Sequence, residues 1–86
     1  MRIVWDEPKR RATLETRGLD FATLTADFFE TALITATRAG RFHAVGMHHG
    51  LPTTVIFLPL GTEAISIISM RAASTKERTQ WRRSHP

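Results

Sequence analysis

Three short connections between residues 32 and 70 constrain the fold of this chain more than any other feature. They lie at 38–40, 49–50 and 59–61, and each contains glycine, which allows the backbone conformations of tight turns. The stretches that they separate have strand character, and Ile and Thr are frequent in them. Connections this short join neighbouring strands in antiparallel fashion. The sequence therefore predicts an antiparallel sheet with strands at 32–37, 41–48, 52–58 and 64–70.

A short edge strand and an exposed helix are predicted at the N-terminus. Residues 2–5 are Arg, Ile, Val and Trp, and branched and aromatic side chains of this kind are frequent in strands. Asp6 is a suitable N-cap for a helix, and Pro8 is favoured in a first turn. Gly18 can adopt the left-handed conformation that ends many helices. The helix should therefore run from Asp6 to about Thr16.

The second predicted helix supplies much of the core. Asp20 can cap it, and Leu19 before the cap can contact Leu24 as a hydrophobic staple. Phe21, Leu24 and Phe28 recur at helical spacing and give a broad apolar face. This helix should cover the sheet, because a stripe of this kind is far more often core than a surface on which bases stack.

A capping box predicts a C-terminal helix directly after the last strand. Ser74 and Glu77 stand three residues apart, so each side chain can accept from the backbone amide of the other. The helix should run from Thr75 to about Arg83, with Trp81 as its only large apolar residue. With the helices on one side, these elements predict an α+β fold: a small antiparallel sheet of four to five strands, two N-terminal helices and one C-terminal helix.

Length and composition limit the class of protein. The 86 residues suit one domain, spanning 1–86, with one modest core. Cysteine is absent, which excludes disulfides and thiolate metal sites. No apolar run reaches the length of a signal peptide or a membrane span. We therefore expect a cytoplasmic protein that contacts no membrane.

The positive charge is concentrated at the C-terminal end. The formal net charge is +4, and residues 71–86 contain five Lys or Arg residues and one acid. Such a segment can bind nucleic acid or an acidic protein surface. An ordinary solvated helix has the same composition about as often, so charge alone leaves both interpretations open.

The histidines do not predict a metal site. His48 and His49 are adjacent, so on a strand their side chains would point to opposite faces, and at a hairpin tip they would be exposed. His43 lies in mid-strand and could act as a general base, although a hydrogen-bonded strand histidine is the commoner case. His85 belongs to the C-terminal tail. We expect neither a metal nor a cofactor.

A set of cations remains as the candidate site: Lys9, Arg17, Arg71 and Arg78. RNA cleavage without a metal needs a base for the 2′-hydroxyl, cations for the phosphorane charge and a proton for the leaving 5′-oxygen. Guanidinium groups hold phosphate bidentately, so Arg71 and Arg78 suit the second task. Lys9 or Arg17 could assist them if the first helix faces the open side of the sheet. The base is not identified by this pattern, because the chain lacks tyrosine and arginine seldom gives up its proton.

Six segments have the order and spacing of a known family. They are 4–9, 18–21, 28–29, 41–46, 67–71 and 76–78. These segments resemble the BrnT family, the toxin half of the BrnT/BrnA type II toxin–antitoxin pair. The resemblance implies a RelE-like fold, a ribonuclease activity that stops translation, and neutralisation by a BrnA-like ribbon-helix-helix antitoxin, through which operator DNA is bound.

The resemblance places Lys9, Arg71 and Arg78 at positions that the family favours, and two departures concern proton transfer. Arg17 stands where the family usually has histidine, and Phe57 where it commonly has tyrosine. We predict catalytic roles for Lys9, Arg17, Arg71 and Arg78, and RNA binding by Lys76, Trp81, Arg82 and Arg83.

Two functions from different classes follow from this sequence. The first is an endoribonuclease toxin that cleaves mRNA without a metal and inhibits translation. The second is a catalytically degenerate binding module that only forms an antitoxin complex for operon repression, a role that the departures at Arg17 and Phe57 favour. The expected partners are the antitoxin and RNA, with the toxin present as a dimer within a hetero-oligomer.

Overall fold

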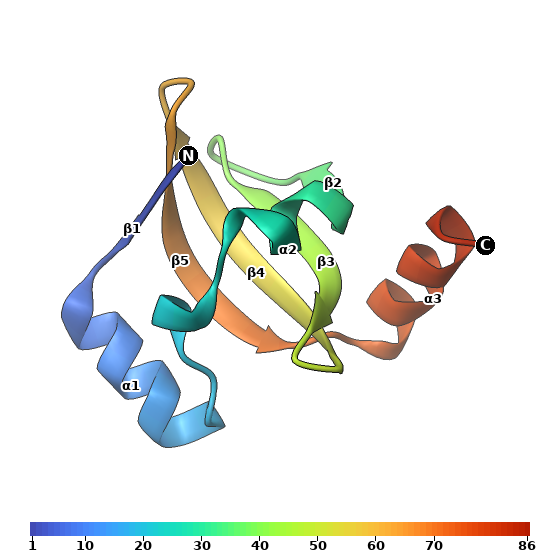
Figure 1. The fold of residues 1–86 in the computed structure, drawn as a ribbon, viewed down its shortest axis with the longest axis horizontal. Coiled ribbons are helices and arrows are strands. Elements are labelled where there is room, and N and C mark those ends of the chain that lie inside the picture. The colour runs from blue at the N-terminus through green and yellow to red at the C-terminus, as the bar shows by residue number, and fades with distance from the viewer.

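The computed structural model describes residues 1–86 and contains a five-stranded sheet with three α-helices (Figure 1). The strands lie close to the predicted ranges, but the turn predicted at 59–61 is wrong and lies at 61–63. Pro59 and Leu60 continue the strand and pair with Ile65 and Ala64; the neighbouring strand on the other side pairs only as far as Phe57, and proline is tolerated where a strand is locally an edge. None of the helices has the length and apolar character needed to cross a membrane. In chain order the elements are β1 (Arg2–Trp5), α1 (Glu7–Arg17), the 3₁₀ turn η1 (Phe21–Thr23), α2 (Ala26–Thr31), β2 (Leu33–Ala36), β3 (Phe42–His48), β4 (Leu51–Leu60), β5 (Ala64–Ala72) and α3 (Thr75–Ser84).

The strands lie in the order β1-β5-β4-β3-β2. The four strands from β2 to β5 pair antiparallel, as their short connections predicted. At the edge, β1 pairs parallel with β5, so that Arg2 lies opposite Ala64 and Trp5 opposite Ile67. The sheet is therefore mixed. No tight turn joins these two strands, and most of the chain lies between them, so turn chemistry does not fix their direction.

The predicted second helix is interrupted after one turn. Asp20 caps only η1, Leu24 is extended with φ −73° and ψ 137°, and α2 begins two residues later. The predicted staple between Leu19 and Leu24, as N′ and N4 of one helix, is therefore wrong. The carbonyl of Asp20 already accepts from the amide and the hydroxyl of Thr23, at 3.1 and 2.7 Å, which competes with the helical bond to Leu24.

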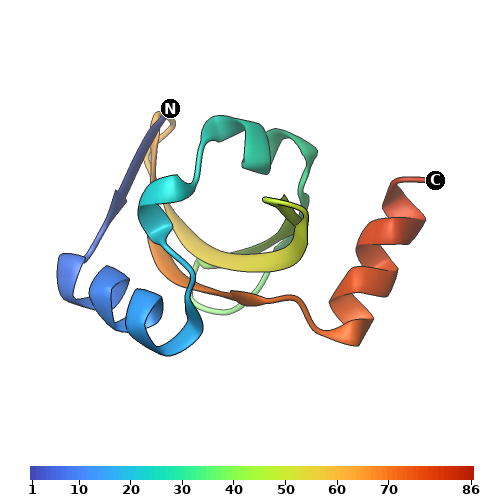
Figure 2. The ribbon, with the colours of Figure 1, turned by 60° about the horizontal axis from the view of Figure 1, so that its bottom comes forward.

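The core lies between η1, α2 and the inner face of the curved sheet (Figure 2). Ala44, Val55 and Met70 form one row across β3, β4 and β5, and each is fully buried. Phe28 of α2 packs against this core, and a Cβ at Gly46 would lie 3.3 Å from its ring. A side chain at Gly46 would therefore require the Phe28 ring to shift by a few tenths of an ångström.

The helix α3 lies on the other face of the sheet. Successive strand side chains alternate between faces, so Thr54 and Arg71 point away from the face that holds Val55 and Met70. Both contact Glu77 of α3. The prediction that all helices share one side is wrong, because these contacts hold α3 on the outer face; Figure 2 shows α2 within the curve of the sheet and α3 outside it.

Candidate functional site

A partly buried ion pair closes the junction between β5 and α3. Arg71 donates from Nη1 and Nη2 to the two carboxylate oxygens of Glu77, at 2.7 and 2.9 Å. Glu77 also accepts from the hydroxyl of Thr54 at 2.9 Å and from the amide of Ser74 at 2.8 Å, which confirms the predicted capping box. These bonds, that of Arg71 foremost, lower the pKa of Glu77 to about 2. Glu77 is therefore a carboxylate at neutral pH.

His43 lies beside the same carboxylate. Its Nδ1 is 3.8 Å from Oε2 of Glu77, the oxygen that accepts from Nη2 of Arg71. This distance is longer than a hydrogen bond, so the interaction is electrostatic and attractive when the imidazole is protonated. The side chain of His43 is 29% exposed and can reach a ligand on the outer face. The structure thus brings a proton-exchanging group to the predicted cation site.

Arg17 reaches β5 from the end of α1. Its Nη1 donates to the carbonyl of Met70 at 3.0 Å and to the hydroxyl of Ser69 at 3.3 Å. Ser69 and Arg71 are two residues apart on one strand, so their side chains share the outer face. The end of α1 therefore does face the open side of the sheet, and Arg17 contacts the two residues that precede Arg71 on β5.

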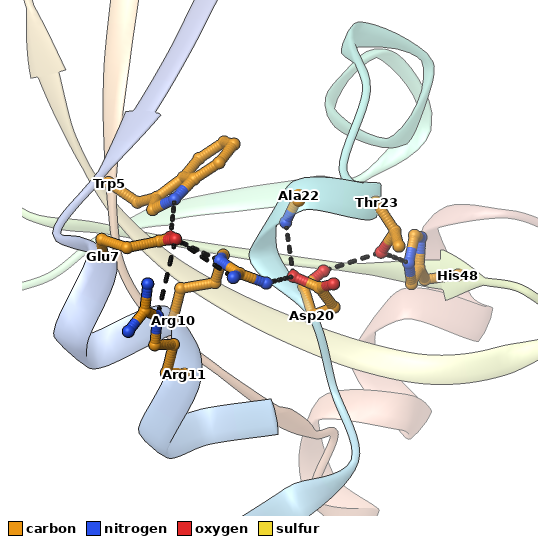
Figure 3. A network of polar contacts seen from close by, with 8 residues as sticks. All are labelled: Trp5, Glu7, Arg10, Arg11, Asp20, Ala22, Thr23 and His48. Atoms are coloured by element: carbon orange, nitrogen blue, oxygen red, sulfur yellow. Dashed lines mark hydrogen bonds and ion pairs between the residues drawn. The ribbon is translucent and has the colours of Figure 1, made fainter. Parts of the chain in front are cut away.

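A chain of polar contacts fixes the position of α1 (Figure 3). Trp5 of β1 and Arg10 both donate to the Glu7 carboxylate, and Arg10 also donates to Asp20 at 3.1 Å. The bond from Arg10, followed by that from Trp5, lowers the pKa of Glu7 to about 2. The amide of Ala22 and then Arg10 lower the pKa of Asp20. These charge-assisted bonds join α1 to β1 and to η1, and thereby aim Arg17 at β5.

The remaining predicted catalytic residues lie apart from this group. Lys9 is exposed on α1, and no side-chain contact links it to Arg71. Arg78 donates to the hydroxyl of Thr75 at 3.2 Å and lines a largely apolar cavity of about 310 Å³ between α3 and β3. Arg71 does not border that cavity. Arg71 and Arg78, which the sequence predicted to hold phosphate together, therefore do not border a common site.

Trp81 is packed against the domain. Its ring stacks on His85 with centroids 4.3 Å apart, and it lines the same cavity together with Arg82. The indole N–H is buried and has no hydrogen-bond partner. Stacking of an RNA base on this ring face would require His85 to move away. The other predicted RNA-binding side chains, Lys76, Arg82 and Arg83, are exposed.

The paired histidines at the β3–β4 hairpin do not point to opposite faces. Their rings stack with centroids 4.0 Å apart, because His49 has a φ of 50° and belongs to the turn, where strand alternation ends. His48 contacts the hydroxyl of Thr23 through Nε2 at 2.8 Å. Burial, and then the neighbouring charge of His49, lower the pKa of His48. No cluster of three or more His, Asp or Glu side chains that could hold a metal occurs in the chain.

A family model described as the ribonuclease toxin BrnT of a type II toxin–antitoxin system matches residues 5–77. This match and the fold define a class of protein, the ribonuclease toxins of type II toxin–antitoxin systems. The chain belongs to the BrnT family, and a protein antitoxin is the partner that such a system implies.

A solved structure gives independent support for this family. The 1.1 Å crystal structure of the Brucella abortus ribonuclease toxin BrnT is 49% identical in sequence and superposes with a TM-score of 0.81. The match covers 87% of this chain and 99% of that one, which confirms the predicted α+β fold. No match was found among curated protein sequences.

The family match divides the predicted site residues into two groups. The residues within the matched range, which ends at Glu77, are Lys9, Arg17, Arg71 and Lys76. The range also contains His43, whose contact with Glu77 the sequence did not reveal, because the contact depends on strand register and on the face that α3 covers. The residues beyond it are Arg78, Trp81, Arg82 and Arg83.

Proposed function

We propose that this chain cleaves mRNA without a metal and thereby stops translation in the cytoplasm. The observation that supports this proposal best is the placement of Arg17 and Arg71 at the same end of β5. The phosphorane formed during cleavage carries more negative charge than the starting diester, and preorganised guanidinium groups stabilise that added charge. The Nε–H of Arg71 makes no hydrogen bond within the chain and is free to donate to a phosphate oxygen.

The partner that we propose is a BrnA-like antitoxin of the ribbon-helix-helix class, with operator DNA bound only through it. The basic C-terminal segment, residues 71–86, suits an acidic or amphipathic segment of such a partner. Residues 1–86 would act as one toxin domain, present as a dimer within the toxin–antitoxin hetero-oligomer. Co-expression with the antitoxin should then restore growth, and mass spectrometry of the purified complex should detect both proteins.

Purified protein and a defined RNA test the activity directly. We expect cleavage in the presence of EDTA, with products that carry 2′,3′-cyclic phosphate or 3′-phosphate ends and 5′-hydroxyl ends. Expression of the chain alone should arrest bacterial growth and translation. Soluble, folded protein that leaves growth unaffected and RNA intact would contradict the proposal.

A binding module without catalysis is the second candidate. The Arg71–Glu77 pair favours this candidate, because both terminal nitrogens of Arg71, which could hold phosphate, already contact the Glu77 carboxylate. In this case the same RNA stays intact with and without EDTA, while the antitoxin complex still forms and represses the operon. The RNA assay therefore separates the two candidates.

A further inference from the structure

His43 is an ionisable residue on the outer face of the sheet, and it is not among the residues that we propose to bind phosphate. We propose that His43 is the general base of the RNA cleavage, an inference that rests on the proposed function and supplies the group that the cation pattern lacks. Imidazole is the side chain best suited to exchange a proton at neutral pH.

Strand register places His43 across the sheet from the cations. His43, Ile56 and Ser69 form one row over β3, β4 and β5. Ser69 at one end of this row accepts from Arg17, and Arg71 lies two residues further along the same strand. His43 at the other end is two strand spacings away, roughly 10 Å along the sheet. A phosphate held by the arginines can therefore present its neighbouring ribose to His43, above Ile56.

The charges around His43 suit a base. Glu77 on α3 is an ionised carboxylate 3.8 Å from Nδ1, and it stabilises the imidazolium that forms when His43 takes a proton. Arg71 on β5 lies beyond that carboxylate and is paired with it. The neighbours of His43 within the sheet, Thr35 on β2 and Ile56 on β4, carry no charge. With Nδ1 facing Glu77, Nε2 is the nitrogen left for the substrate.

The proposed step conserves every atom and charge. Nε2 of His43 takes the proton of the 2′-hydroxyl while the 2′-oxygen forms a bond to phosphorus. The bond between phosphorus and the 5′-oxygen breaks, and the leaving oxygen takes a proton from water. The products are a 2′,3′-cyclic phosphate and a 5′-hydroxyl, and the imidazolium then returns its proton to the solvent. Arg17 and Arg71 hold the non-bridging oxygens throughout.

The variant His43→Gln tests this role against His49→Gln, which changes an exposed histidine of the hairpin turn. We expect His43→Gln to cleave RNA at least about 100-fold more slowly than the wild type, which is the scale of general base catalysis. Its affinity for RNA should equal that of the wild type. His49→Gln should cleave normally. Cleavage by a folded His43→Gln protein within about threefold of wild type, in the range of a minor contact, would overturn the role of His43 alone. A wild-type chain that cleaves no RNA would overturn the proposed function as well.

Two measurements separate a base from other roles; the first needs no variant, and the second uses His43→Gln shown to be folded. The wild-type cleavage rate should fall at acid pH, because a protonated imidazole cannot accept a proton; a flat pH–rate profile contradicts the role. A substrate with sulfur in place of the bridging 5′-oxygen has a leaving group that needs no proton. This substrate should not rescue His43→Gln, and rescue would show that His43 is an acid instead.

Discussion

Arg71 and Glu77 face each other across the end of β5, and each oxygen of the carboxylate meets one nitrogen of the guanidinium, at 2.7 and 2.9 Å. The same carboxylate caps α3 and lies next to His43. One acidic residue therefore fixes the C-terminal helix, orients the guanidinium that we assign to phosphate, and adjoins the proposed base. Structure and proposed chemistry are therefore coupled at Glu77.

The variant Arg71→Ala should abolish growth arrest and RNA cleavage while the chain stays folded. Loss of the pair should lower the free energy of unfolding by about 1–2 kcal/mol, a modest value because the pair lies near the solvent. Urea denaturation and growth after induction measure the two effects. Arg38→Ala, in the exposed turn before β3, is the matched control and should change neither. Full toxicity of Arg71→Ala would refute the phosphate role.

The variant Arg17→Ala should slow RNA cleavage by roughly tenfold or more, because one cation near the phosphorane is lost. Stability should change little, since the side chain is exposed and its two acceptors can bind water instead. Single-turnover cleavage is the measurement. Arg11→Ala removes a guanidinium from the same helix, away from β5, and should leave the rate unchanged. Equal rates for both variants would remove Arg17 from the site.

Acid should destabilise the chain through Glu77. Its pKa is about 2 in the folded chain against an ordinary value of 4.5, so between these values the unfolded chain binds the proton more readily. The stability that this carboxylate contributes is therefore present above about pH 4.5 and is lost as the pH falls towards 2. Glu77→Gln should be less stable than wild type at pH 7, and the difference should vanish near pH 2. Urea denaturation across this range checks the convergence, with Glu15→Gln, on the exposed side of α1, as control.

The variant Trp81→Phe should unfold with a free energy equal to or slightly above that of the wild type. Phenylalanine keeps most of the apolar contact and removes a buried N–H that has no partner. Trp81→Ala should lose about 2 kcal/mol, because it enlarges the cavity beside β3. Thermal or urea unfolding of both variants tests this difference. A large loss in Trp81→Phe would mean that the indole N–H has a partner in solution.

Local sequence signals determined much of the fold, and tertiary contacts determined the rest. Asp6 and Gly18 are the N-cap and C-cap of α1, as predicted, and the capping box of Ser74 and Glu77 forms the start of α3. The break at Leu24 escaped prediction, because a helix through this segment and a 3₁₀ turn followed by a shorter helix bury nearly the same phenylalanines.

The candidate site was predictable only in part for a similar reason. Residue type marked Arg71 and Arg17 as phosphate ligands, and the structure brings them to one strand end. The contact of His43 with Glu77 depends on the β3–β4–β5 register and on the face that α3 covers. Neither follows from any local pattern, so histidine spacing alone gave no reason to prefer His43.

The parallel pairing of β1 with β5 has a consequence for how the toxin is made. The first strand finds its partner only after residues 64–67 have been synthesised, and Arg17 needs Ser69 and Met70 before it can dock. A nascent chain that is still tethered to its ribosome therefore lacks the assembled candidate site until Ser69, Met70 and Arg71 have emerged. The order of translation itself delays any activity that we propose for this site.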